Sequence, residues 1–163
     1  MDVRIDETWT VETSGIIADI ARTIWNEYYP SVVTQEQVDY MIENFQSAPA
    51  IERDVEEGYR YFVIYCDGER AGYLALLPEK DSVFLSKIYI FERFRGKGAA
   101  TAVMRLIKDI AKGKDSIYLT VNRNNRRAIA FYEKEGFVIT SQKKKDIGGG
   151  FVMDDHIMKF DLR

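Results

Sequence analysis

A glycine-containing turn is the segment of the sequence best suited to bind a phosphate. Residues 88–100 read IYIFERFRGKGAA, so an apolar strand pattern ends, Gly96 and Gly98 follow, and an apolar helical pattern begins at once. The first amides of a helix lack internal partners and lie at the positive end of its dipole. Glycine leaves those amides uncovered, and two arginines and a lysine add positive charge. The segment therefore predicts an anion site.

Two familiar phosphate motifs do not fit this turn. A Walker loop needs four residues between its glycines and a following Lys-Ser/Thr, and the segment has neither. A dinucleotide fingerprint needs a third glycine and an acidic residue near the end of the next strand. Thr101 and Val121-Asn122 occupy those places instead. An ordinary strand-to-helix turn with solvated basic residues stays open as the alternative.

Two motifs resemble those of the GNAT acyltransferase superfamily. Arg93–Gly98 (RFRGKG) matches its acetyl-CoA signature R/Q-x-x-G-x-G/A, and residues 121–137 (VNRNNRRAIAFYEKEGF) resemble its N-x-x-A-x-x-F/L-Y-x-K-x-G-F block. The resemblance covers most of the chain. It implies an acetyl-CoA-dependent N-acetyltransferase that moves acetyl directly onto an amine, without a covalent enzyme intermediate and without a metal.

The same resemblance implies roles for individual residues. Pantetheine would lie beside a strand that separates from its parallel neighbour, whose backbone amide would polarise the thioester carbonyl, and the pyrophosphate would bind the amides of the turn. Asn125 would contact the pantetheine arm, and Tyr132 would protonate the leaving thiolate. The predicted cofactor-binding set is Ile88, Tyr89, Ile90, Arg95, Gly96, Lys97, Gly98, Ala99, Ala100, Asn125 and Tyr132.

Tyr132 is the predicted catalytic residue. A phenol with an ordinary pKa near 10 can give a proton to a departing thiolate when it is held within hydrogen-bond reach. The alternative is plain packing, because Ala128, Phe131 and Tyr132 form an apolar stripe at helical spacing.

No general base is identified. Many relatives carry a glutamate on the strand before the turn, but residues 84–88 read FLSKI and contain no carboxylate. A histidine side chain can act as a base near neutral pH, although a single histidine on a terminal strand, such as His156, is more often structural. The open candidates are Glu27, Tyr28, Tyr29, Asp154, Asp155 and His156.

The acceptor amine also stays open among a small amine, a polyamine and a protein N-terminus. Acidic residues in or next to the segment expected to shape the acceptor pocket hint weakly at a cationic amine; they are Glu27, Glu36, Asp39, Glu43, Glu52 and Asp54. The competing function is a non-catalytic acyl-CoA-binding regulator of the same fold, against which Tyr132 argues.

The elements around these motifs predict an α/β (α+β) fold. Helices are expected after Thr13 or Ser14, which would cap the first, after a Thr34–Gln37 capping box, and after Ser47. Strands at 60–66, 71–77, 82–90, 116–121, 137–145 and 151–160 follow, with helices at 99–111 and 126–135, and a short strand lies between Val3 and Val11. We expect a mixed, mostly antiparallel sheet of about seven strands with helices on both faces, interrupted between Ser82–Ile90 and Ser116–Val121.

Bulk properties predict one cytoplasmic domain over residues 1–163. A net charge of −3 gives no support to a nucleic-acid or membrane-surface binder, and no apolar run approaches the roughly 20 residues that span a bilayer. Cys66 and His156 are the single cysteine and histidine, which rules out an internal disulfide and a Cys/His zinc cluster. A homodimer stays open beside a monomer.

Overall fold

The computed structural model describes residues 1–7 and 9–163. Its elements are β1 (Val3–Asp6), α1 (Thr13–Tyr28), α2 (Gln35–Phe45), α3 (Ala48–Glu56), β2 (Arg60–Cys66), β3 (Glu69–Pro78), β4 (Ser82–Ile90), α4 (Ala99–Ile110), β5 (Ser116–Asn122), α5 (Arg126–Lys134), β6 (Val138–Gly148) and β7 (Phe151–Asp161). Short 3₁₀ turns occupy Tyr29–Ser31 and Glu92–Phe94. Residue 8, within the range expected to hold the first strand, lies outside the described residues.

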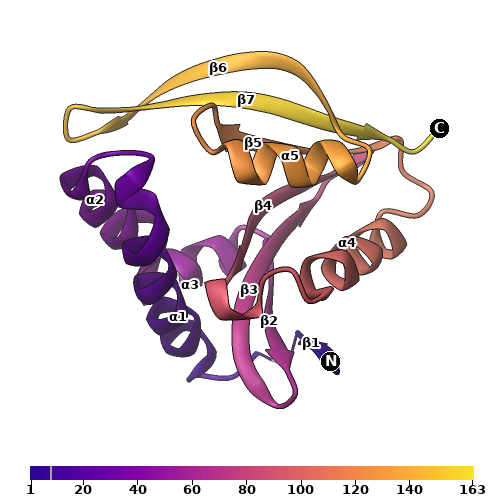
Figure 1. The fold of residues 1–163 in the computed structure, drawn as a ribbon, viewed down its shortest axis with the longest axis horizontal. Helices are drawn as coiled ribbons and strands as arrows, with labels where there is room; N and C mark the ends of the chain where they lie inside the picture. Colours follow the sequence, from indigo (N-terminus) through magenta and orange to yellow (C-terminus); the bar gives the residue numbers. More distant parts are fainter. Residues whose placement is uncertain (8) are drawn as a thin grey trace.

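Seven strands form one mixed sheet in the order β1-β2-β3-β4-β5-β7-β6. Every neighbouring pair is antiparallel except β4 and β5, which are parallel. Helices α1, α2 and α3 lie on one side of the sheet and α4 on the other (Figure 1). The expected α/β class with a mostly antiparallel sheet and helices on both faces is confirmed.

The sheet opens between its two parallel strands. Residues Ser82–Leu85 of β4 pair with Ser116–Leu119 of β5, and no pairing between the two strands continues beyond them. Strand β4 nevertheless runs on to Ile90, paired with β3 alone. The predicted interruption is confirmed, and it leaves one edge of residues 86–90 without a strand partner.

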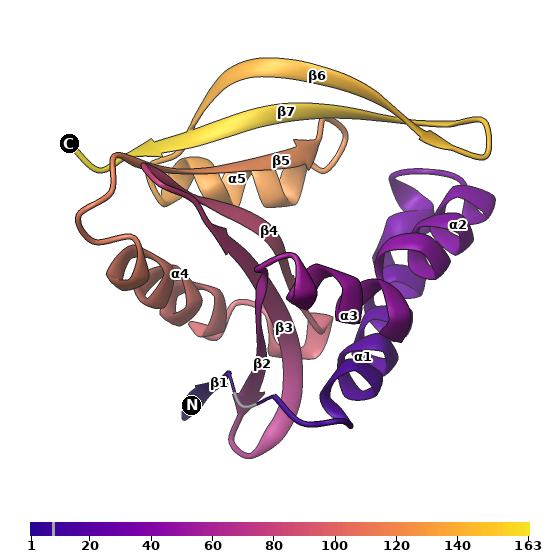
Figure 2. The same ribbon diagram turned by 180° about the vertical axis from the view of Figure 1, so that it is seen from behind.

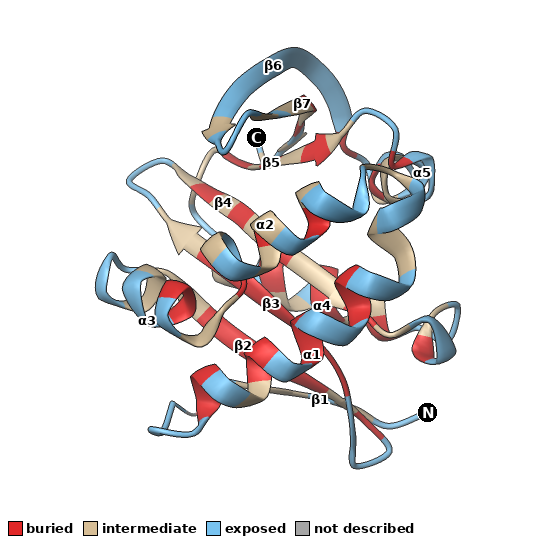
Figure 3. Cartoon of the chain, turned by 90° about the vertical axis from the view of Figure 1, so that its left-hand side faces the viewer, coloured by how far each residue is buried: buried red, intermediate tan, exposed pale blue. Residues whose placement is uncertain are grey.

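Two apolar clusters hold the helices on the sheet. On one face, α4 and α5 pack through residues such as Val103, Met104 and Tyr132 against alternate side chains of the strands. On the other face, α1, α2 and α3 pack through residues such as Ile17 and Val38 against the intervening strand side chains. This alternation follows from the two-residue period of a strand buried on both sides. The central strands are buried, whereas β6 is exposed along nearly its whole length (Figure 3).

The starts of the first helices differ partly from expectation. Thr34 caps α2 by accepting a hydrogen bond from the Gln37 amide, and Ser47 caps α3. The capping box is not completed, because the Gln37 side chain donates to the Val152 carbonyl 3.2 Å away. The expected cap at Thr13 or Ser14 is wrong: Thr13 is the first helical residue, and its hydroxyl accepts from the Thr10 amide instead.

The tip of the β6–β7 hairpin rests on α2, as seen from behind the molecule (Figure 2). The Tyr40 hydroxyl donates to the Ile147 carbonyl at 2.7 Å, and the Tyr40 and Phe151 rings lie 5.2 Å apart. A Cβ on Gly149 would lie 2.8 Å from a Tyr40 ring carbon. The glycines at 148–150 therefore serve this contact as well as the turn. Within the described residues, no helix combines the length and apolar character needed to span a membrane.

Candidate active site

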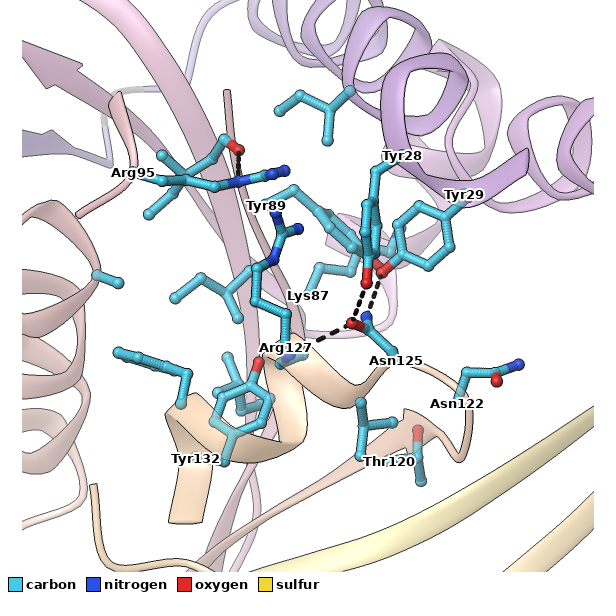
Figure 4. Close-up of a pocket in the computed structure, with 18 of the residues that line it drawn as sticks. Tyr28, Tyr29, Lys87, Tyr89, Arg95, Thr120, Asn122, Asn125, Arg127 and Tyr132 are labelled. Atoms are coloured by element: carbon cyan, nitrogen blue, oxygen red, sulfur yellow. Dashed lines mark hydrogen bonds between the residues drawn. The ribbon is translucent and has the colours of Figure 1, made fainter. Parts of the chain in front are cut away.

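A cavity of about 510 Å³ lies where β4 and β5 separate. Its walls come from the end of α1, from α2, from β4, from the turn before α4, from the end of β5, from α5 and from β7. Figure 4 shows side chains from several of these elements directed toward one another across the opening. The cavity thus joins both faces of the sheet at its one interruption.

The turn before α4 leaves helix amides uncovered. Gly96 and Gly98 have φ values of +71° and +88°, and a Cβ on either would meet nothing within 4 Å. Gly98 is the N-cap of α4 and offers no capping side chain. Helices α2, α3 and α5, in contrast, are each capped by a side chain. The start of α4 combines open space, free N–H groups and a positive dipole end, which suits an anion.

Most of the residues predicted from the sequence come together in this cavity. The lining includes Ile88, Tyr89, Ile90, Arg95, Gly96, Gly98, Ala100, Asn125 and Tyr132. Lys97 and Ala99 are not part of the lining: Lys97 is exposed, and Ala99 is buried in the core on the α4 face. These two residues belong to the turn through their backbone, and their side chains point elsewhere.

Two arginines face the cavity without an acidic partner. Arg95 and Arg127 both line it, and their guanidinium carbons lie 5.7 Å and 4.1 Å from the centroid of the Tyr28 ring. Neither is within 4 Å of a carboxylate oxygen among the described residues. Burial, and then the charge of Arg127, lowers the pKa of Arg95. Arg127 was not singled out from the sequence, because it occupies a variable position of the second motif.

Asn125 is the N-cap of α5 and also ties that helix to α1. Its Oδ1 accepts from the Ala128 amide at 3.3 Å and from the Tyr28 hydroxyl at 3.0 Å. Its Nδ2 donates to the Tyr29 hydroxyl at 3.4 Å. The Asn125 side chain is therefore fixed by three hydrogen bonds, two of which join the start of α5 to Tyr28 and Tyr29 at the end of α1.

Tyr132 projects from α5 toward the opening. The residue is 8% exposed, and its ring packs against Phe131 and Phe137. No hydrogen bond to its hydroxyl is drawn in the close-up of the cavity (Figure 4). Burial, with a smaller contribution from Tyr29, raises the pKa of Tyr132 well above its ordinary value. The phenol therefore keeps its proton at neutral pH, as an ordinary tyrosine does.

An aromatic wall lies on the α1 side. Trp25 stacks on Tyr29 with 4.1 Å between ring centroids, and Tyr89 of β4 meets Trp25 edge-on at 5.3 Å. Burial raises the pKa of Tyr29 to about 12. Trp25 is both packed in the core and part of the cavity lining.

Lys87 occupies the strand region where no carboxylate was found. Its Nζ donates to the Phe45 carbonyl and the Tyr61 hydroxyl, each at 2.6 Å, and to Asp54 Oδ2 at 3.4 Å. Burial lowers the pKa of Lys87 to about 8, and Asp54 opposes that shift. Because all three ammonium protons have acceptors, Lys87 joins β4 to β2, α2 and α3. The sequence contained no signal for this network.

The candidate bases divide into two groups. Tyr28, Tyr29 and Asp155 line the cavity, whereas Glu27, Asp154 and His156 do not. None of the six acidic residues that hinted at a cationic acceptor lines it either. The cavity lining therefore gives no support to the inference of a cationic acceptor from these six residues.

Comparisons with known proteins agree with this geometry. The model of the acetyltransferase (GNAT) family matches residues 18–137. An uncharacterised N-acetyltransferase of Mycobacterium tuberculosis is 30% identical over 154 residues, which cover 93% of this chain and 98% of the relative. A spermine/spermidine N(1)-acetyltransferase of Bacillus subtilis is 30% identical over 134 residues, covering 74% and 84%.

Solved structures share the fold. The PaiA N-acetyltransferase of Thermoplasma acidophilum, crystallised with coenzyme A, superimposes with a TM-score of 0.82 at 20% identity, over 99% of this chain and 100% of that one. A GCN5-related N-acetyltransferase structure from Rhodopseudomonas palustris gives a TM-score of 0.78 at 15% identity, over 99% and 95%.

Proposed function

The chain belongs to the acetyltransferase (GNAT) family and is an acyltransferase, and from that premise we propose that it moves acetyl from acetyl-CoA directly onto an amine. One observation carries the proposal. A single cavity is bounded by the uncovered start of α4, the unpaired edge of β4 and the Tyr132 ring. These are the parts needed to hold a phosphate, an extended amide-bearing arm and a leaving sulfur in one line.

The donor would occupy the α4 and α5 side. Its pyrophosphate would accept from the amides of residues 95–100, where Arg95 and Arg127 add two charges that lack an acidic partner within 4 Å among the described residues. Its pantetheine arm carries two amides, which would pair with the free edge of Ile88–Ile90 as an added strand does. The PaiA N-acetyltransferase structure with the same fold contains coenzyme A, which supports acetyl-CoA as the donor.

The reaction would proceed by direct attack. The neutral amine nitrogen forms a bond to the thioester carbon, and a backbone amide of the separated strand stabilises the oxyanion. The carbon–sulfur bond then breaks, and the Tyr132 phenol gives its proton to the thiolate. The support for this role is positional, because Tyr132 lines the cavity at the end of α5 that faces the opening of the sheet.

Polyamines and small primary amines are the acceptors to test first. A spermine/spermidine acetyltransferase is among the relatives, which favours polyamines. The aromatic rings of Trp25, Tyr28 and Tyr29 in the same cavity favour a cationic amine of either kind. A protein N-terminus is the third class.

The test is transfer to a panel of amines. The protein would be incubated with acetyl-CoA and spermidine, putrescine, monoamines or short peptides with a free N-terminus, and free thiol and acetylated product would be measured together. We expect thiol release that depends on the amine, with matching product mass. Tight acetyl-CoA binding without transfer to any acceptor would contradict the proposal and favour the non-catalytic acyl-CoA-binding alternative.

A further inference from the structure

Asp155 is placed on the side of the opening opposite Tyr132. Along β7, Met153 packs against the α1–α2 cluster and Met158 against the α4–α5 cluster. Since successive strand residues alternate between faces, Asp155 shares the face of Met153. It lies directly across from Asn122 at the end of β5, where the sheet opens.

The carboxylate of Asp155 is buried and incompletely satisfied. The residue is 6% exposed, its Oδ1 has no hydrogen-bond partner, and it lines the cavity. The other carboxylate in the lining, Glu135, lies 3.8 Å from Lys108 Nζ. Asp155 has no such ion pair among the described residues. Burying an unpaired carboxylate is costly, so its retention at a cavity wall indicates a cationic ligand.

The groups around Asp155 make it a stronger base than an ordinary aspartate. Burial and the neighbouring Asp154 raise the pKa of Asp155 to about 6, and Lys143 and His156 oppose them. Lys143 lies across from it on β6. The remaining titratable or charged groups that other elements contribute to the cavity are Tyr28, Tyr29, Lys87, Tyr89, Arg95, Arg127, Tyr132, Lys134 and Glu135.

We propose that Asp155 binds the ammonium group of the acceptor and takes its proton, so that the acid and the base of the reaction act from opposite faces of the sheet. This inference rests on the proposed acetyl transfer. The proton leaves nitrogen for the Asp155 carboxylate, the nitrogen–carbon bond forms and the carbon–sulfur bond breaks. Tyr132 protonates the sulfur, and both side chains return to their starting states by proton exchange with water.

The experiment compares Asp155→Asn with Asp154→Asn. The second variant is the matched control, because Asp154 is the adjacent carboxylate, pairs with Arg123 at 3.3 Å and does not line the cavity. For each protein, kcat/KM for the best amine would be measured from pH 5.5 to 9, together with the Kd for acetyl-CoA and the thermal midpoint.

For Asp155→Asn we expect kcat/KM at pH 7 to fall by roughly 10²–10⁴-fold, the usual range for a general base. The loss should shrink at high pH, where more of the amine is already neutral. The part of the acidic limb that follows ionisation of Asp155 should disappear, leaving the rise that follows the neutral fraction of the amine, and the Kd for acetyl-CoA should change little. The thermal midpoint should hold or rise, because a buried charge is removed. Asp154→Asn should keep kcat/KM at pH 7 and the Kd for acetyl-CoA near the parent values, with its acidic limb at lower pH, because the charge of Asp154 helps to raise the pKa of Asp155.

A second variant leaves Asp155 in place. Lys143→Met removes an exposed cation that lowers the pKa of Asp155, so the acidic limb should move to higher pH. An unchanged profile in Asp155→Asn, or an unmoved limb in Lys143→Met, overturns the inference while the parent still acetylates amines. A parent that acetylates nothing overturns the proposed function itself.

Discussion

The two sides of the cavity present different chemical groups. The side formed by α4 and α5 presents backbone amides at Gly96 and Gly98, two arginines and one tyrosine. The side formed by α1, α2 and β7 presents stacked rings and one incompletely satisfied carboxylate. The first is suited to a long anionic molecule, and the second to a cation with an apolar body.

This difference has a physical explanation. Backbone amides recognise phosphate whatever the side chains are, so the first side needs only a few residues at fixed places within two short segments, among them Gly96 and Gly98. The second side draws single residues from α1, α2, β4 and β7, each held by its own packing. Variants on the first side should therefore change how acetyl-CoA binds or reacts. Variants on the second side should change the KM or kcat/KM for the amine.

The largest expected effect belongs to Tyr132. Tyr132→Phe keeps the ring and its contacts with Phe131 and Phe137 but removes the proton donor. Single-turnover rates should fall by roughly 10²–10⁴-fold, with little change in the Kd for acetyl-CoA. Equal rates in variant and parent would mean that Tyr132 is a packing residue and that water supplies the proton.

The second-largest effect is expected at Gly98, where a substitution should weaken acetyl-CoA binding and leave the rate of acetyl transfer little changed. Gly98→Val places a β-branched side chain at φ +88° in the space where the phosphate would approach. Losing one or two charge-assisted hydrogen bonds should weaken acetyl-CoA binding by roughly 10–100-fold. Gly113→Val is the control: it follows the other end of α4, has φ +87° and equally open space, but does not line the cavity. Equal losses in both variants would indicate backbone strain alone.

On the second side, Asp155 should make stability depend on pH. Its pKa is about 6 in the folded protein against 3.8 in the reference, so the folded state binds the proton more tightly than the unfolded state. The contribution of protonated Asp155 to the free energy of unfolding is fully present below about pH 4 and is lost as pH rises through 6. Relative to Asp155→Asn, the unfolding free energy of the parent should decline by up to about 3 kcal/mol across that window. Parallel curves from chemical denaturation would contradict the raised pKa.

Asn125 joins the two sides and should give the smallest effect. Asn125→Ala should cost about 1 kcal/mol of stability through the lost cap, as Thr34→Ala should at α2. Asn125→Asp keeps the cap acceptor but removes the donor to Tyr29. We expect Asn125→Asp to keep near-parent stability while the KM for the amine rises. An unchanged KM would show that the Asn125–Tyr29 contact is not needed on the acceptor side.

Sequence patterns predicted the first side better than the second. The turn at residues 93–100 and the Asn125–Tyr132 stretch are local, so the order of residues alone places a strand end, glycines and a helix start together. Helix and strand periodicity likewise predicted most elements to within a few residues. Thr13 failed as a cap because its hydroxyl accepts a hydrogen bond from the Thr10 amide, a contact with no periodic signature.

The second side depends on contacts across long stretches of chain. Lys87 meets Phe45, Asp54 and Tyr61, which lie 42, 33 and 26 residues away. Asp155 could be named as one of six candidates, but only the register of β7 against β5 distinguishes it from Asp154 and His156. A single sequence carries no local signal for such register.

The β6–β7 hairpin tip on α2 has a mechanical consequence. Four registered residue pairs join β4 to β5 at the closed end of the opening, and the Tyr40–Ile147 hydrogen bond spans it at the far end. The paired residues of β4 and β5 thus close one end of the opening, and the contact between the hairpin tip and α2, which we call the strap, crosses the other end. Releasing the strap would widen the amine side first, since the start of α4 lies away from the hairpin tip, on the other face of the sheet (Figure 1). The size of amine admitted would then depend on the strength of the strap as well as on the dimensions of the cavity at rest.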